Sequence, residues 1–260
     1  MRRYMIMFAL LTLLLMSSAC SGHDSEENDT AAEADRGAVS LAPGQDGDFT
    51  EGVWIRKYME NYACFKFESP KGFQIVCDPF GIYEILQPDV VVESHQHADH
   101  TDITMLEPGY DLIAKPGEYQ YEEAEIKGYA GKHNKGDEED TNHIFVVKMN
   151  DIAIAHFASQ GELPSDEVLD EIGPVDVLLI QIFMNPKYNK LSIEDADAII
   201  QRLKPKIVIP EHGDENMGSL LAEHLEVTQE LIPTGDMIIT REILDLSDKI
   251  RVVNLDNNGN

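Results

Sequence analysis

Basic residues are scarce in this chain of 260 residues. It has 20 lysines and arginines against 48 aspartates and glutamates, which gives a formal net charge of −28 at pH 7. A surface this acidic repels nucleic acid and anionic membranes, because both carry dense negative charge. The composition therefore argues against nucleic acid as a partner. It also disfavours a highly anionic substrate, unless metal ions reverse the field locally.

Long apolar runs are missing everywhere except near the N-terminus. There, two arginines precede an apolar run over residues 5–16, and small residues then lead to Cys20, which is the layout of a secretory signal. The run is shorter than the roughly 20 apolar residues that a membrane-spanning helix needs. We predict a lipoprotein signal peptide over residues 1–19 with lipidation at Cys20. The alternative is an ordinary signal cut near Ala19.

Large apolar residues are nearly absent from residues 20–50, which carry eight acidic residues against one arginine. Such a segment cannot bury enough surface to offset the chain entropy lost on folding. We therefore expect an acidic disordered tether, followed by a folded domain over residues 51–260. The protein would be exported and anchored to the cell envelope, with the lipid as its only membrane contact. Neither the choice of membrane nor the oligomeric state follows from the sequence.

Cysteine is rare, with three residues in the whole chain. If Cys20 carries lipid, Cys64 and Cys77 remain in an exported domain, where disulfides persist. They flank a turn at residues 69–72, and a symmetrical fold-back there would place them opposite each other within disulfide reach. The alternative is two buried free thiols, which behave as small apolar side chains. The sequence leaves both open, because it does not fix the turn type.

The domain reads as strands first and then as strands that alternate with helices. This order favours an α/β (α+β) fold with sheets packed face to face and helices outside. Capping serines and helical spacing predict helices over 165–171, from 192 to about 203, and over about 217–226. Alternating or continuous apolar runs predict strands over 52–57, 61–67, 73–77, 89–92, 145–147, 152–155, 177–180 and 207–209.

Three histidines and an aspartate follow directly after the apolar strand at 89–92. They are His95, His97, Asp99 and His100, and both residue types are ligands for zinc and similar metals. In an extended segment, residues two apart point the same way, so His95 and His97 can reach one ion. The chain must then turn for Asp99 and His100 to face a second ion. A polar loop with unrelated histidines is the alternative, and this density of ligands disfavours it.

This His-x-His-x-Asp-His motif after a buried strand resembles the signature of the metallo-β-lactamase superfamily. Residues 78 to about 213 look like the branch of metal-dependent hydrolases that includes the L-ascorbate-6-phosphate lactonases. The supporting pieces are an Asp-Pro turn within 77–80, the apolar stretch 175–180 and the Pro-x-His end of 204–212. The resemblance implies a four-layer αββα sandwich with a two-metal site at one edge of the sheets.

The same resemblance implies two groups of three ligands for one or two divalent metal ions. Zinc is the favoured metal, with manganese or iron as alternatives. Two of these ligands have simpler alternatives, namely a surface histidine at position 133 and a loop histidine at position 212. The first ion would be held by His95, His97 and His133, and the second by Asp99, His100 and His212.

One position departs from the pattern of the branch. An aspartate in a Gly-Asp pair normally bridges both metals, and Ala158-Ser159 stands in its place here. A serine hydroxyl is neutral and a poor metal ligand, so the site loses one negative charge and its bridge. We expect one ion, the second, to bind more weakly. Glu162, Glu211 or Asp214 could supply a carboxylate instead, but nothing in the sequence positions them. His156 is interpreted as a packing residue.

These features predict a metal-dependent hydrolase that uses a metal-bound hydroxide on an ester, lactone or phosphodiester of a small-molecule substrate. Asp99 is the candidate catalytic residue, because it lies beside the nucleophile and could orient it or shuttle a proton. The alternative is a degenerate, non-catalytic lipoprotein that binds a metal or a ligand. Ser159 favours that alternative, as do Phe183 and Met184, which replace glycines of the branch and would narrow the substrate pocket.

Overall fold

A computed structural model of the chain describes residues 49–136, 140–183, 190–213 and 216–256. The segment predicted as a signal peptide, most of the predicted tether, Cys20, Met184 and Asp214 lie outside the described residues. Within the described part, none of the helices has the length and apolar character that crossing a membrane requires.

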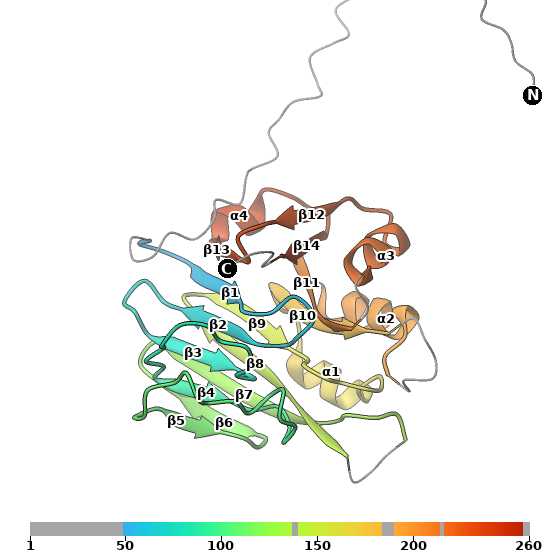
Figure 1. Ribbon diagram of the computed structural model, residues 1–260. Helices are drawn as coiled ribbons and strands as arrows, with labels where there is room; N and C mark the ends of the chain where they lie inside the picture. The colour runs from blue at the N-terminus through green and yellow to red at the C-terminus, as the bar shows by residue number, and fades with distance from the viewer. Residues whose placement is uncertain (1–48, 137–139, 184–189, 214–215, 257–260) are drawn as a thin grey trace, which may run out of the picture. The chain divides into compact units, whose positions relative to one another are not determined.

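Two β-sheets form the centre of the fold (Figure 1). The first has the strand order β13-β1-β2-β3-β4-β5, and the second has the order β12-β14-β11-β10-β9-β8-β7-β6. The first sheet consists of β1 (Val53–Lys57), β2 (Phe65–Glu68), β3 (Gln74–Cys77), β4 (Val90–Val92), β5 (Asp111–Ile113) and β13 (Asp236–Ile239). The second consists of β6 (Gly117–Gln120), β7 (Ala124–Lys132), β8 (Thr141–Met149), β9 (Ile152–His156), β10 (Val177–Ile182), β11 (Ile207–Gly213), β12 (Gln229–Ile232) and β14 (Arg251–Leu255).

The two sheets pack face to face. Alternate residues of each sheet enter one shared core, in which Val53 and Ile75 of the first sheet join Phe145 and Leu179 of the second, all fully buried. This alternation follows from the period of two along a strand, which sends neighbouring side chains to opposite faces. The expected α/β sandwich of two sheets is thus confirmed.

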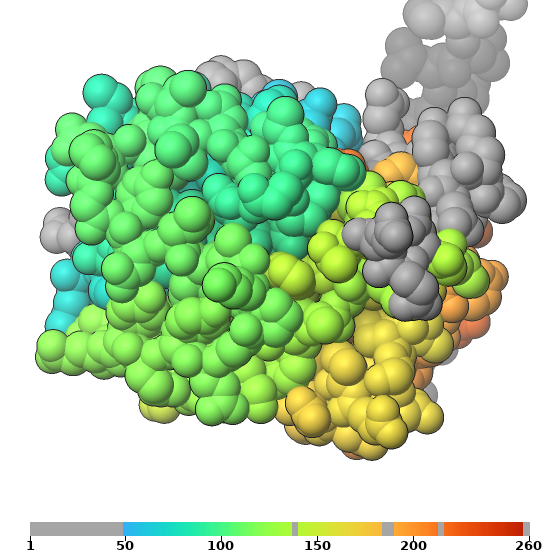
Figure 2. Space-filling model, turned by 90° about the horizontal axis from the view of Figure 1, so that it is seen from below, coloured from blue at the N-terminus to red at the C-terminus, as the bar shows by residue number. Residues whose placement is uncertain are grey.

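Helices cover the outer face of the second sheet. They are α1 (Asp166–Ile172), α2 (Ile193–Leu203) and α3 (Met217–His224), while a short α4 (Arg241–Asp245) follows β13. Serine caps begin α1 and α2, as predicted, by accepting backbone N–H bonds at Ser165 and Ser192. Their apolar sides pack with the outer residues of the sheet, and Figure 2 shows the yellow segment of α1 beside the green segment that carries β5 to β7.

Loops cover the outer face of the first sheet in the described part of the chain. Segments 78–89 and 93–110 pack Ile82, Leu86 and Leu106 over Val76 and Val91. A parallel bridge joins Leu86 to Leu106. Prolines at positions 79, 88 and 108 explain why these segments form loops, because proline cannot continue a regular helix or a sheet ladder. The outer layer expected as helix is therefore formed by loops on this side.

The candidate disulfide is wrong, because the turn between β2 and β3 holds one more residue than a symmetrical fold-back. The amide of Ser69 donates to the carbonyl of Phe73, and Phe65 consequently pairs with Cys77. Cys64 therefore points to the other face of the sheet, under the loops, whereas Cys77 enters the core between the sheets. Both are buried free cysteines.

Four buried strands end at the same edge of the sandwich. The first is β4, and β9, β10 and β11 lie parallel to one another in the second sheet. All residues of β4 and β10 are buried, which matches their largely apolar sequences, with Gln181 as the polar exception in β10. The loops that follow these strands carry the histidine motif and its expected partners. At the opposite edge, the predicted hairpin between β8 and β9 turns at Asn150 and Asp151, whose φ angles of 48° and 60° fit a type I′ turn.

Candidate metal centre

Two groups of three side chains bring metal-binding atoms together at this edge. Within each group, one atom from each residue lies within 4.8 Å of the others. Nitrogen and oxygen ligands sit about 2 Å from a zinc ion, so small side-chain adjustments would let each group share one ion. The groups are His95, His97 and His133, and Asp99, His100 and His212. These are the six residues expected from the sequence, in the expected division.

The first group is a cluster of three imidazoles. The ring centroids of His95, His97 and His133 lie 4.5–4.6 Å apart in every pairing. The Nε2 atom of His95 lies 3.1 Å from the Nδ1 atom of His97. Burial and the charge of neighbouring His100 lower the pKa of His95 to about 2, and burial also lowers the pKa of His133. Neutral imidazoles are the form that binds metal, so the surroundings keep these rings ready for an ion.

The second group combines two imidazoles with a carboxylate. The rings of His100 and His212 stack with their centroids 5.8 Å apart, and Asp99 Oδ2 lies 3.8 Å from His100 Nε2. Burial, with the charge of His100, lowers the pKa of His212 to about 4. The rings of His95 and His100 have centroids only 4.0 Å apart, so the two groups are direct neighbours.

The second ring nitrogen of several of these histidines is held by the protein. Such partners fix the orientation of a metal-binding imidazole and leave its other nitrogen for the ion. In His95, His100 and His133 the protein contacts Nδ1, so Nε2 is the nitrogen left to bind an ion. The contacts are Ser94 Oγ to His95 Nδ1 at 3.0 Å, Asp78 Oδ2 to His100 Nδ1 at 3.1 Å, and Asp140 Oδ2 to His133 Nδ1 at 2.8 Å. The residues present therefore fit a metal centre.

Behind the second group lies a buried row of charged side chains. Asp78 accepts bonds from the amide and hydroxyl of Ser94 at 2.7 and 2.8 Å, and from His156 Nε2 at 2.8 Å. The other ring nitrogen of His156 lies 2.9 Å from Glu211 Oε2. His156 thus does more than pack, because it joins two buried carboxylates. No local sequence pattern marks this pairing, since these residues lie far apart along the chain.

None of the described carboxylates considered as substitutes for the missing aspartate enters either ligand group. Glu211 faces His156, and Glu162 forms an ion pair with Lys132 at 3.3 Å. Ser159 itself is buried beside the second group, with its Oγ atom 3.4 Å from His100 Nε2. The preceding Ala158 has a φ of 49°, the left-handed region where glycine is usual. The backbone therefore has the form of the expected Gly-Asp turn, with a hydroxyl in place of the carboxylate.

A lysine that no sequence motif marks lies between the two groups. Lys190 Nζ donates a short hydrogen bond to the carbonyl of His133 and a longer one, 3.5 Å, to the carbonyl of Ser159. Burial lowers its pKa to about 8, against the attraction of Asp140 and Asp99. It stands just before the cap of α2, in a segment without a recognisable motif, so no sequence signal marked it.

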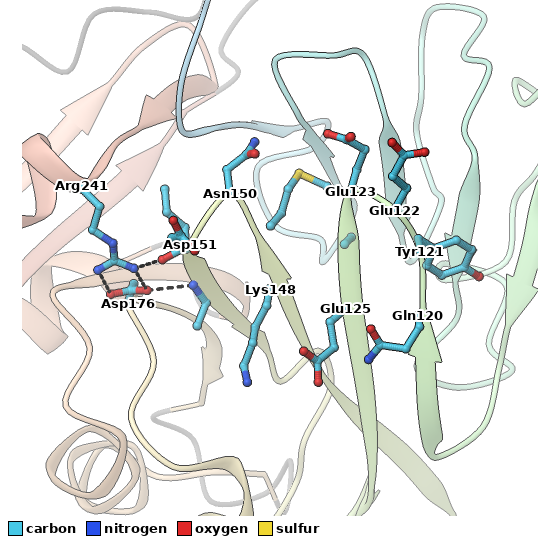
Figure 3. Close-up of a pocket in the computed structure, with 14 residues that line it drawn as sticks. Gln120, Tyr121, Glu122, Glu123, Glu125, Lys148, Asn150, Asp151, Asp176 and Arg241 are labelled. Atoms are coloured by element: carbon cyan, nitrogen blue, oxygen red, sulfur yellow. Dashed lines mark hydrogen bonds and ion pairs between the residues drawn. The ribbon is translucent and has the colours of Figure 1, made fainter.

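One cavity among the described residues lies away from this centre. It has a volume of about 560 Å³ and is lined by the β6–β7 turn, the β8–β9 turn and Asp176 (Figure 3). Arg241 lines the cavity and donates hydrogen bonds to both carboxylate oxygens of Asp176. The cavity meets β9 at Ile152, whereas the metal centre lies beyond His156 at the other end of that strand, roughly 13 Å away at about 3.3 Å per residue. The two features are therefore separate.

Comparison with known proteins identifies related sequences and folds. The profile of the beta-lactamase superfamily domain matches residues 56–212, more than half of the chain. No curated protein shows significant similarity. A candidate zinc-dependent hydrolase of the metallo-beta-lactamase superfamily from Thermotoga maritima is similar with a TM-score of 0.64 and 24% identity, over 78% of this chain and 98% of that chain.

Two further solved structures share the fold at lower identity. A candidate metal-dependent hydrolase from Parabacteroides distasonis has a TM-score of 0.56 and 12% identity, over 69% of this chain and 93% of that chain. A diiron β-hydroxylase from Streptomyces venezuelae has a TM-score of 0.53 and 14% identity, over 68% of this chain and 52% of that chain. At these identities the likeness shows the fold alone.

We predict that His156 stays protonated at neutral pH in the metal-free protein. Burial opposes the charge, but Glu211 and Asp78 on either side raise its pKa to about 10. The unfolded chain releases this proton near pH 6.5, so the folded state binds one more proton above that pH, and stability falls as pH rises. The stability advantage of the wild type over His156→Gln should therefore shrink by up to about 1.4 kcal/mol per pH unit between pH 7 and 8.5. Urea unfolding measures it.

His143→Gln provides the matched control. Burial lowers the pKa of His143, so this ring is neutral in both the folded and unfolded states above pH 7. Its effect on stability should stay constant across the same range. Equal pH dependence for the two variants would contradict a protonated His156.

Proposed function

This chain belongs to the beta-lactamase superfamily, and on that premise we propose that it is a metal-dependent hydrolase acting on a small-molecule ester, lactone or phosphodiester. The observation that carries the proposal is the convergence of six ligand side chains into two adjacent groups. Structural neighbours described as candidate metal-dependent hydrolases support it at the level of the fold.

The donor set suits one or two divalent ions. Five imidazoles and one carboxylate are ligands that zinc accepts, and manganese or iron are the alternatives. Ions held there would polarise the carbonyl or phosphoryl oxygen of the substrate and lower the pKa of a water molecule between them. The first group, with three imidazole ligands, provides the stronger site. The second lacks the carboxylate that Ser159 replaces, and we expect its ion to bind more weakly.

The centre is open on one side, as a catalytic metal site must be to admit substrate. His95 and His100 are buried, whereas His97 is exposed and His133 and His212 are partly exposed. The side chain of Asp99 keeps about a third of its surface exposed, at 34%. We assign Asp99 the catalytic role of orienting the attacking water or holding its proton, because its carboxylate reaches both the second group and the open side.

Aromatic side chains border His212 on the same side. The ring of Tyr62 meets His212 edge-on with centroids 5.8 Å apart, and Phe183 lies 6.2 Å from the same ring. Phe80 packs on Tyr62 at 4.7 Å. These rings would contact the organic part of a substrate and exclude water around it. This arrangement supports the expectation that Phe183 narrows the pocket.

Metal binding should be measurable in two steps on protein first stripped with a chelator. We expect up to two equivalents of zinc, with hydrolysis of a generic phosphodiester or lactone lost on chelation and restored by metal. His95→Ala should abolish the stronger step and His212→Ala the weaker one, because each removes one ligand from one group. Calorimetry and metal analysis give the stoichiometry.

The surface residue His224 supplies the control for both variants. It lies on α3, 3.4 Å from Asp197 and outside both ligand groups. His224→Ala should therefore keep both binding steps and the activity. A single weak equivalent without turnover in the wild type would contradict the hydrolase and leave a non-catalytic metal-binding protein.

Restoring the missing carboxylate should strengthen the second binding step. Ser159 lies beside His100 in a backbone that already has the form expected for Gly-Asp. We predict that Ser159→Asp raises the affinity for the second ion by about tenfold or more, since a charged ligand replaces a neutral one. Thr50→Asp adds the same charge at an exposed position before β1, at the opposite edge, and should change nothing. Equal affinities in both variants would mean that Ser159 does not line the metal site.

We also propose that the protein is exported and anchored by lipid at Cys20. The support is the sequence pattern of two arginines, an apolar run and small residues before this cysteine. Cys20→Ala should move the protein from the membrane fraction to the soluble fraction, because acyl chains provide the anchor. Ser25→Ala serves as the control and should stay with the membrane. Retention of Cys20→Ala in the membrane fraction would refute the anchor.

A further inference from the structure

Lys190 is a cation at the metal centre without a carboxylate in hydrogen-bond contact among the described residues. Its two hydrogen bonds run to backbone carbonyls, and Asp140 and Asp99 act on it only through longer-range attraction. This is unusual in a chain with 48 acidic and 20 basic residues, where a partner is easily supplied. A partly buried lysine normally has such a partner, because burying an unpaired charge costs free energy.

The position of the ammonium group is fixed between the two ligand groups. It bonds the carbonyl of His133, which belongs to the first group, and that of Ser159, which lines the second. Its charge also lowers the pKa of both His133 and His212. An ammonium group has three donors, and carbonyls take two of them. The remaining donor is available to a ligand at the centre.

The six ligand residues compensate only part of the charge of a loaded centre, while the carboxylates of Asp78 and Asp140 lie behind the rings of His100 and His133. Asp99 is the one carboxylate among the six ligand residues, and the five imidazoles are neutral as ligands. One divalent ion together with Lys190 and Asp99 carries a net charge of about +2, and two ions bring it to about +4. An aspartate at position 159 would have lowered both values by one. A single carboxylate on the substrate compensates little of this charge, whereas a phosphate group carries about −1.5 to −2 at neutral pH.

We propose that Lys190 forms an anion subsite of the metal centre and that the substrate presents a phosphate group to it. This inference rests on the proposed function, since the charge that needs compensation includes the bound metal. Lys190 is then a specificity-determining residue. It supplies a hydrogen bond and a positive charge at a fixed place, whichever bond of the substrate is cleaved.

Calorimetry with inorganic phosphate on the full-length, zinc-loaded protein tests the subsite directly. We expect phosphate to bind, and Lys190→Gln to weaken this binding about tenfold or more with unchanged zinc stoichiometry. Lys190→Arg should stay within a few-fold of the wild type, because it keeps the charge. Acetate, with one negative charge, should bind at least tenfold more weakly than phosphate to the wild type.

Lys132 provides a matched control close to the same site. It directly precedes His133, but its Nζ atom forms an ion pair with Glu162 at 3.3 Å. Lys132→Gln removes the same charge from a lysine that already has an acidic partner. Its phosphate affinity should stay within twofold of the wild type.

The results of these measurements distinguish a failure of the Lys190 subsite from a failure of the proposed hydrolase function. Zinc uptake with equal phosphate affinity in the wild type and Lys190→Gln overturns the subsite alone. Acetate binding as tight as phosphate binding overturns the assignment of a phosphate-bearing substrate. Failure to take up zinc overturns the proposed function and the subsite with it. Zinc uptake and lysine-dependent phosphate binding without any turnover support the subsite while contradicting the hydrolase.

Discussion

The buried carboxylate of Asp78 is the constraint from which the metal centre is built. It follows β3 in a left-handed conformation with φ of 48°, and its amide bonds the carbonyl of Val92 at 2.8 Å. A buried charge is tolerated only when its oxygens are satisfied, and here Ser94 and His156 donate to them while His100 Nδ1 lies 3.1 Å away. The start and the end of the histidine motif are thereby tied to one point. The ring of His100 is positioned by the negative charge of this carboxylate, so the orientation of the second group depends on Asp78.

The candidate ligands could be named from the sequence because their signal is local. A buried strand followed by closely spaced histidines and an aspartate is visible in the chain itself, and the resemblance added His133 and His212, which the fold brings into the same two groups. The strand β4 before His95 and the strand β11 that contains His212 were also predicted, whereas β7 before His133 was not. The strand β2 begins at Phe65, later than expected, because residues 59–62 form a turn. Strands with mixed polarity, such as β6, β7 and β12, were missed, because polar and charged residues leave them without an apolar run, although burial alternates along β6 and the first half of β7.

What could not be predicted depends on pairing across the fold. The contact between Asp78 and His156 spans 78 positions, and the one between His156 and Glu211 joins two strands whose registers no local pattern fixes. The same limitation produced the wrong disulfide, because one additional turn residue reverses the face on which Cys64 lies. Lys190 belongs to this class as well. Its role arises only from the carbonyls of His133 and Ser159, which the fold brings to it from two other loops.

Two electrostatic fields act on an anionic substrate of this protein, one from its acidic surface and one from the cationic centre, and they act over different ranges. The net charge of −28 repels an approaching anion, but at physiological ionic strength exposed charges are largely screened beyond about 8 Å. Metal ions and Lys190 would attract the same anion at contact distance, where partial burial weakens screening. Ser159 increases this contrast, because it removes one negative charge from the centre and none from the surface. The acidic composition and an anionic substrate are therefore compatible. If the proposed subsite exists, a serine at position 159 would weaken the second metal site and favour phosphate at the centre.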